Sequence, residues 1–309
     1  MFKSIDNAFD LIVSSFRIFW KYPYLILPVF IVWIFYAPSL IYMKYHFPWK
    51  EYNLTGQITF AYLYIYLLAF LLTFSCSILM ELLQQNEMGK KFSFSKAIGD
   101  SFSRNFSHIV VITIIWSLIW FLLIILQVIF SKIRSSNSDE QTLEGIAQTL
   151  SGQSSESSLF NSSIEAIKKG VRMISFLIMP AVAWLDLGIE ESFSKGIQVL
   201  KLRKKEFIAG FGLTIIVEIL IFAYPAWMFT MSHKGVEFSD LSWYICILYI
   251  GIATSYLIYI EQMFAAELFL WHLEYEKQVK KAIESNEAIP EFNDVKRPVL
   301  LDEIPDLKE

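Results

Sequence analysis

The sequence predicts an all-α, polytopic membrane protein in which six transmembrane helices form three repeats of an amphipathic elbow helix plus a helical hairpin. Of its 309 residues, 55% are hydrophobic and only 18% are charged, which is more apolar surface than a water-soluble domain can bury. Several apolar runs approach 20 residues, the length at which a helix crosses a bilayer. A polar–apolar heptad also occurs twice, as FSKAIGD at 94–100 and FSKGIQV at 193–199.

Six apolar runs are long enough, or nearly long enough, to span a membrane as helices. The fourth is the weakest, because Arg172 and Asp186 leave only thirteen uncharged residues between them. The predicted spans are Tyr24–Met43, Thr59–Met80, Ile109–Phe130, Met173–Leu187, Phe207–Met231 and Leu241–Ile260.

An amphipathic segment precedes each odd-numbered span, at about 4–21, 93–107 and 190–205. In each segment apolar residues recur at helical spacing while polar residues occupy the other side, a pattern typical of a helix lying in the membrane interface. Small residues take the equivalent position in all three repeats: Ala8, Ala97 and Gly196.

The distribution of basic residues predicts the orientation of the spans. Of the 26 Lys and Arg residues, 18 lie on the side that holds both chain ends, and basic residues favour the cytoplasmic side. We therefore expect cytoplasmic termini and an extracytoplasmic serine-rich loop at 131–161. The membrane domain is predicted to cover 1–285 and an acidic cytoplasmic tail 286–309.

The tail contains an apolar core, RPVLLDEIP at 297–305, within an acidic stretch. Three prolines prevent a continuous helix there. Such a peptide docks on a protein partner or on the elbow helices of its own chain, or it stays solvated and disordered.

Each returning span carries an acid near its predicted cytoplasmic end, where the helix dipole disfavours negative charge. Two interpretations remain open: these acids reach toward the lipid headgroups, or they pair with basic residues and clamp the elbow helices to the bundle. The acids are Glu81, Asp186 and Glu261, and the candidate basic partners are Arg17, Lys96, Arg104 and Lys195.

Glu218 is the one acid predicted at the bilayer midplane. It is the twelfth of the twenty-five residues in Phe207–Met231. A carboxyl group at this depth costs about 2.5–3.5 kcal/mol on insertion scales, so it faces the bundle interior or a water-filled cavity. It is either a structural hydrogen-bonding group or a group that titrates or binds a cation during function.

The run MPAVAWLDLGIEESFSKGIQVLKLRKKEFIAGF at 179–211 resembles a pattern found in several bacterial membrane-protein families. These are six-span families of no assigned function, the YciC-type inner-membrane proteins, and the membrane domain of some glycerophosphodiester phosphodiesterases. The opening FKSIDNAFDLIVSSFRIFWKYPYLILP is similar to the first of these groups. The resemblance implies a bacterial inner-membrane location and this fold, and it implies no activity.

Motifs for an enzyme are missing from the sequence, since it contains no GxSxG, HExxH, GxGxxG or Walker-type loop. The four histidines are far apart at predicted membrane boundaries, so neither a metal nor another cofactor is expected. We expect membrane lipids as partners, with a possible protein partner at the tail, and no nucleic acid. The leading hypothesis is a non-enzymatic module that organises lipids or anchors a membrane complex. The alternatives are a transporter or channel using Glu218 and an intramembrane enzyme.

Overall fold

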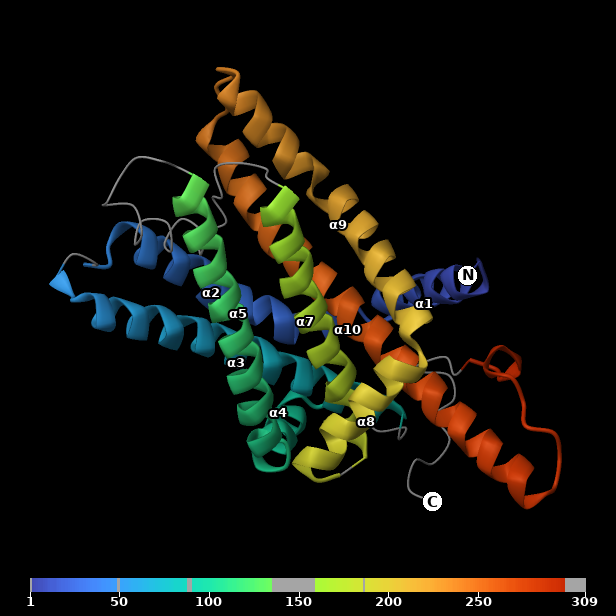
Figure 1. Cartoon of the computed structure of the whole chain (residues 1–309). Coiled ribbons are helices and arrows are strands. Elements are labelled where there is room, and N and C mark those ends of the chain that lie inside the picture. Colours follow the sequence, from blue (N-terminus) through green and yellow to red (C-terminus); the bar gives the residue numbers. More distant parts are fainter. Residues whose placement is uncertain (1, 49–50, 88–90, 135–158, 186, 298–309) are drawn as a thin grey trace.

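A computed structural model describes residues 2–48, 51–87, 91–134, 159–185 and 187–297. Within these residues the chain is helical and contains no strand, so the predicted all-α class is confirmed (Figure 1). The elements are α1 (Phe2–Lys21), η1 (Pro23–Ile26), α2 (Leu27–Tyr45), α3 (Leu54–Glu87), α4 (Phe94–Ser103), α5 (Phe106–Arg134), α7 (Leu159–Trp184), α8 (Ile189–Leu202), α9 (Lys204–His233), α10 (Asp240–Glu284) and η3 (Phe292–Asp294).

Five segments in the described part of the chain are helical, long and apolar enough to cross a membrane. They fall on five of the six predicted spans, so five candidate transmembrane helices are confirmed by length and composition, as a multi-pass membrane protein requires. The five segments are Pro23–Met43, Thr55–Gln85, Phe106–Gln127, Lys204–His233 and Asp240–Glu284.

The predicted fourth span, Met173–Leu187, has the wrong bounds. The helix there is α7, which begins at Leu159 and ends at Trp184, so it starts with a polar stretch that precedes the predicted span. This stretch keeps α7 out of the five apolar candidates. Its charged residues are Glu165, Lys168, Lys169 and Arg172.

Short helices lie in the three segments predicted as elbows, but two segments are interrupted. In 93–107, α4 ends at Ser103 and α5 begins at Phe106. In 190–205, α8 ends before Arg203 and α9 begins after it. At both breaks the chain turns from a short amphipathic helix into a long apolar one.

The small residue of each elbow helix is a packing contact. Ala8 and Ala97 are fully buried, and a Cβ added to Gly196 would lie 2.7 Å from Ile178 Cγ1. A buried serine lies one turn away in each helix: Ser4, Ser101 and Ser192. Small residues four apart allow close helix approach inside membranes, so these positions set how the elbow helices dock.

Apolar side chains cover the outer side of α1 and α4. Phe9 is 54% exposed on α1, and Phe102 is 62% exposed on α4, beside an exposed Ile98. Each helix therefore has a protein-packed side of small residues and a separate apolar side. Exposed apolar residues on an amphipathic helix at the end of a span are suited to the headgroup boundary.

Replacing Ile98 and Phe102 of α4 by Ser is expected to release this helix from the membrane surface while leaving the bundle folded. Each side chain contributes up to about 1.5–3 kcal/mol when buried in an apolar phase, and neither contributes to the protein core. Protease cleavage of 94–103 in liposomes should increase. The control changes the exposed Ser95 and Gly99, which carry no large apolar side chain, to Ala, and equal cleavage in both variants would contradict the docking of α4.

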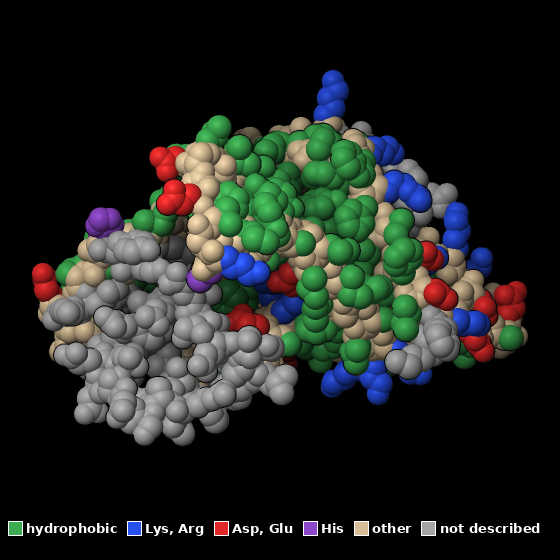
Figure 2. All heavy atoms as spheres, turned by 90° about the horizontal axis from the view of Figure 1, so that it is seen from above, with side chains coloured by type: hydrophobic (Ala, Val, Ile, Leu, Met, Phe, Trp, Pro, Cys, Tyr) green, Lys and Arg blue, Asp and Glu red, His purple; other side chains and the backbone are tan. Residues whose placement is uncertain are grey.

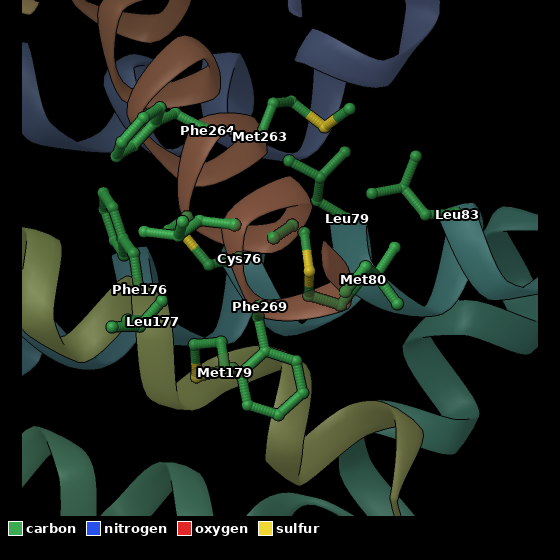
Figure 3. Close-up of a cluster of buried hydrophobic side chains, with 14 of the residues drawn as sticks. Cys76, Leu79, Met80, Leu83, Phe176, Leu177, Met179, Met263, Phe264 and Phe269 are labelled. Atoms are coloured by element: carbon green, nitrogen blue, oxygen red, sulfur yellow. The ribbon is translucent and has the colours of Figure 1, made fainter. Parts of the chain in front are cut away.

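The main hydrophobic core lies where α3, α7 and α10 meet, and Figure 3 shows part of it. The core is filled by large side chains that are almost completely buried. Among them are Cys76, Leu79, Met80, Leu83, Phe176, Leu177, Met179, Met263, Phe264 and Phe269.

Two glycines bring further helices into contact with α10. A Cβ at Gly210 of α9 would lie 2.0 Å from the Phe264 ring, and one at Gly251 of α10 would lie 2.1 Å from Trp33 Nε1 of α2. Because no other residue fits these contacts without movement, α10 is the common element against which α2 and α9 pack.

Candidate functional site

Six charged side chains from three helices meet inside the bundle. Four lie on α7 at spacings of three and four residues, which places them along one side of that helix. α9 and α10 contribute one acid each. We name the charge cluster by its members: Glu165, Lys168, Lys169, Arg172, Glu218 and Glu261.

Glu261 of α10 is the innermost acid, with a fully buried side chain. Arg172 Nε donates to Glu261 Oε2 at 2.8 Å, and Arg172 Nη2 donates to Glu261 Oε1 at 2.9 Å. This two-point geometry is the strongest form of an Arg–carboxylate pair. A carboxylate this deep requires it, because an unpaired buried charge is strongly destabilising.

Lys169 connects the innermost acid to the acid of α9. Its Nζ donates to Glu218 Oε2 at 2.7 Å and lies 3.3 Å from Glu261 Oε1. The Lys169 side chain is only 8% exposed, whereas the Glu218 side chain is 41% exposed. The Lys169 ammonium group therefore contacts both the buried carboxylate of Glu261 and the partly exposed carboxylate of Glu218.

The outer end of the cluster is held by α5. Lys168 Nζ lies 2.8 Å from Glu165 Oε1 and donates to Gln127 Oε1 at 2.7 Å. Gln127 Nε2 in turn donates to Glu165 Oε1 at 3.1 Å. The buried amide of Gln127 thus forms a hydrogen bond with both Lys168 and Glu165. The Glu165 side chain is 61% exposed.

Glu218 of the cluster lies near the middle of a candidate span. Glu218 is the fifteenth of the thirty residues of α9, about 21 Å from either end at 1.5 Å per residue. Figure 2 views the molecule from the end at which α7 begins and α9 ends, and acidic and basic side chains lie there in a recess beside an apolar surface. Side-chain exposure falls from Glu165 and Glu218, at 61% and 41%, to Lys169 at 8%.

The hydrophobic core begins one turn beyond the innermost pair. Phe176 follows Arg172 on α7, and Phe264 follows Glu261 on α10; both aromatic side chains are buried. Figure 3 shows Phe176 and Phe264 among the packed residues of the core. The charges are therefore accessible from one side and separated from the other by tightly packed apolar side chains.

Of the predicted site residues, Glu218 and Glu261 come together in this cluster through Lys169. Of the two interpretations left open for Glu261, pairing with an elbow base is not the one seen, because its ion-pair partners among the described residues are on α7. The helix α10 continues past Glu261 to Glu284. Asp186 lies outside the described residues.

Glu81 is clamped to the elbow region, but by a neutral group. Its Oε1 accepts a hydrogen bond of 2.8 Å from Asn105 Nδ2, and the same nitrogen lies 3.3 Å from Ser77 Oγ. Ser77 Oγ is 3.0 Å from the α4 hydroxyl of Ser101. Asn105, between α4 and α5, is thus the hydrogen-bond partner of Glu81, while the predicted bases Arg104 and Lys96 are close enough to act on it electrostatically.

The predicted bases have separate roles. Lys195 of α8 pairs with Glu276 of α10, which is a clamp between an elbow helix and the bundle but not with a predicted acid. Arg17 and Lys96 form no ion pair within the described residues. Arg104 caps α4, where its backbone N–H donates to Asp100 O.

The described part of the tail docks on its own chain. Arg203 Cζ lies 3.3 Å from the centre of the Phe292 ring, and Trp271 Nε1 donates to Val295 O at 3.1 Å. Arg297 Nη2 pairs with Asp10 of α1 at 2.6 Å. The chain up to Arg297 therefore packs on its own bundle, with the elbow helix α1 as one of its contacts. The predicted docking core at 297–305 lies outside the described residues except for Arg297.

Sequence reasoning missed the basic half of the cluster. Lys168, Lys169 and Arg172 precede the predicted fourth span and enter the sequence analysis only as part of the count of basic residues on the side opposite the chain ends. The sequence did contain a signal, because a charged residue occurs once per helical turn: first Glu165, then Lys168 or Lys169, then Arg172.

No group of three or more His, Cys, Asp or Glu side chains suited to a metal ion occurs in the described residues. Comparison of the chain with protein-family models, curated proteins and solved structures found no match.

Proposed function

We propose that this protein is a transporter or channel, and not an enzyme, in which the charge cluster exchanges protons or a small cation within the membrane. The observation that carries the proposal is the position of Lys169, which contacts the accessible Glu218 and the buried Glu261 together. Ionisable groups at mid-membrane depth are costly and mark ion or proton pathways.

The balance of charge supports exchange at Glu218. The cluster holds three acids and three bases. A proton or cation at Glu218 weakens its attraction for Lys169, whose ammonium can then move toward Glu261 without leaving a buried charge unpaired. Apolar side chains of similar volume would hold α7, α9 and α10 together at lower desolvation cost, so stability alone is a weak reason for this arrangement.

Flux in proteoliposomes tests the function directly. Purified protein is reconstituted with a pH-sensitive dye inside the vesicles, and a pH step is applied with a potassium ionophore to cancel the potential. We expect dye equilibration faster than in protein-free vesicles, and we also expect potassium and sodium gradients to report cation exchange. Vesicles that are tight to all three ions would contradict the proposal.

The proposal includes six spans as three elbow-plus-hairpin repeats, with α7 as the additional crossing, and a bacterial inner membrane as the location. The length of α7 supports a sixth crossing. Its 26 residues extend about 39 Å as a helix, which is more than a hydrocarbon layer of about 30 Å. Packing of its charges against α5, α9 and α10 compensates for their low hydropathy. Six crossings keep both termini in the cytoplasm.

Cysteine labelling tests this topology. In a variant lacking Cys76 and Cys246, we expect Ser151→Cys to react with an impermeant maleimide on intact cells and Lys201→Cys to react only after permeabilisation. Labelling of both positions on intact cells would contradict six crossings. A permeant maleimide supplies the control for reactivity at each position.

A second candidate is a module that organises lipids or anchors a membrane complex. The exposed apolar sides of α1 and α4 favour it, because they enlarge the surface in contact with the headgroup region. The resemblance to YciC-type proteins and to the phosphodiesterase membrane domain is compatible with this candidate. A protein partner would bind the acidic tail beyond residue 297. Absence of flux together with a stable co-purifying protein would favour it.

A further inference from the structure

The joint between α8 and α9 combines exposed basic and apolar side chains at the beginning of a candidate span. Lys201, Lys204 and Lys205 are exposed, and the segment Lys204–His233 is one of the five apolar candidates. Figure 1 shows this joint at the opposite end of α9 from the loop that leads to α10. Lysines at the first residues of a span lie at headgroup depth.

The other charged side chains of this segment are turned inward. Glu206 is buried and accepts a hydrogen bond of 3.1 Å from Ser4 Oγ of α1. Arg203 stacks on Phe292 of the tail and donates to His272 Nδ1 at 3.2 Å. The three lysines form no ion pair within the described residues, so no described acid neutralises their charge at close range.

Apolar side chains flank the lysines on the outer surface. Leu202 is 57% exposed and Ile208 is 65% exposed. Neither is covered by the protein, and both lie within three residues of a lysine. A ligand that fits has an anionic group for the lysines and a hydrocarbon part beside it for the two aliphatic side chains, and this is the chemistry of an anionic lipid.

We propose that Lys201, Lys204 and Lys205, together with Leu202 and Ile208, form a binding surface for the headgroup of an anionic phospholipid. Basic residues next to a span attract anionic lipid with a gain of about fivefold per residue. Zwitterionic phospholipid gains much less, because its own ammonium group opposes the lysines. The proposal depends on membrane insertion of α9 and not on ion exchange at the charge cluster.

Native mass spectrometry of the full chain, titrated with phosphatidylglycerol or phosphatidylcholine, measures the preference. We expect the wild type to bind phosphatidylglycerol more tightly, and the triple variant K201Q/K204Q/K205Q to lose at least about tenfold of that preference. The matched control K277Q/K280Q/K281Q removes three exposed lysines from the far end of α10 and should keep the preference. The triple Lys→Arg variant at 201, 204 and 205 should keep it as well.

Three results would overturn the proposal. The glutamine variant at the joint could bind both lipids as the wild type does, which would leave the acidic tail as the partner of these lysines. Both glutamine variants could lose the preference equally, which would indicate a response to net charge. Glycerol phosphate could displace the lipid, which would indicate a site for a free anion. Thermal unfolding of each variant shows that the change in binding occurs in a folded protein.

Discussion

Replacing Glu261 by Leu is expected to lower the free energy of unfolding by about 3–5 kcal/mol, the usual cost of removing one partner from a buried ion pair. The Glu261 side chain is fully buried, and its loss leaves the Arg172 guanidinium without its two-point partner. Unfolding of the purified protein by a denaturing detergent, followed by circular dichroism, measures the change. Glu165→Gln is the control, because the exposed Glu165 belongs to a pair worth about 0–1 kcal/mol.

A double variant separates the loss of the pair from the loss of packing. Glu261→Leu combined with Arg172→Leu removes both charges, and Lys169 keeps its contact with Glu218. We expect at least half of the lost stability to return, since buried ion pairs replaced by apolar side chains are often neutral. A double variant as unstable as the single one would show that Arg172 is not the group that Glu261 stabilises.

The candidate spans could be predicted from sequence because insertion into lipid depends on a local property. Each apolar run is long enough by itself, and the five candidate segments begin within a few residues of the predicted positions. The small residue of each elbow helix was also visible, because close packing of helices requires a small side chain wherever it occurs. Ala97 and Gly196 are buried as this argument requires.

Only acids of the charge cluster could be predicted as site residues from the sequence, and its basic residues could not. Glu218 stood out as a single charge within an apolar run, but its partner Lys169 lies 49 residues away. Arg172 and Glu261 are 89 residues apart. A charged stretch enters a membrane bundle only when other helices supply its counter-charges, and this depends on tertiary packing that no local pattern reports. The same reason explains why Asn105, and not a basic side chain, holds Glu81.

Glu218→Gln is expected to abolish ion flux in proteoliposomes while leaving the bundle folded. The glutamine keeps the size of the side chain and can still accept a hydrogen bond from Lys169, but it cannot ionise. Because the Glu218 side chain is 41% exposed, loss of its ion pair should cost no more than about 1 kcal/mol. Lys169 retains Glu261 at 3.3 Å as a counter-charge.

Three further variants make the result at Glu218 specific. Glu218→Asp keeps a titratable group and should retain measurable flux, and Glu165→Gln removes the other exposed acid and should leave flux close to wild type. Glu218→Leu loses a polar contact typically worth under about 2 kcal/mol in a membrane and should lack flux as Gln does. Full flux in a folded Glu218→Gln protein would eliminate an essential titrating or cation-binding role. The charge cluster would then be a structural clamp between α7, α9 and α10, and the lipid-organising candidate would be the better supported function.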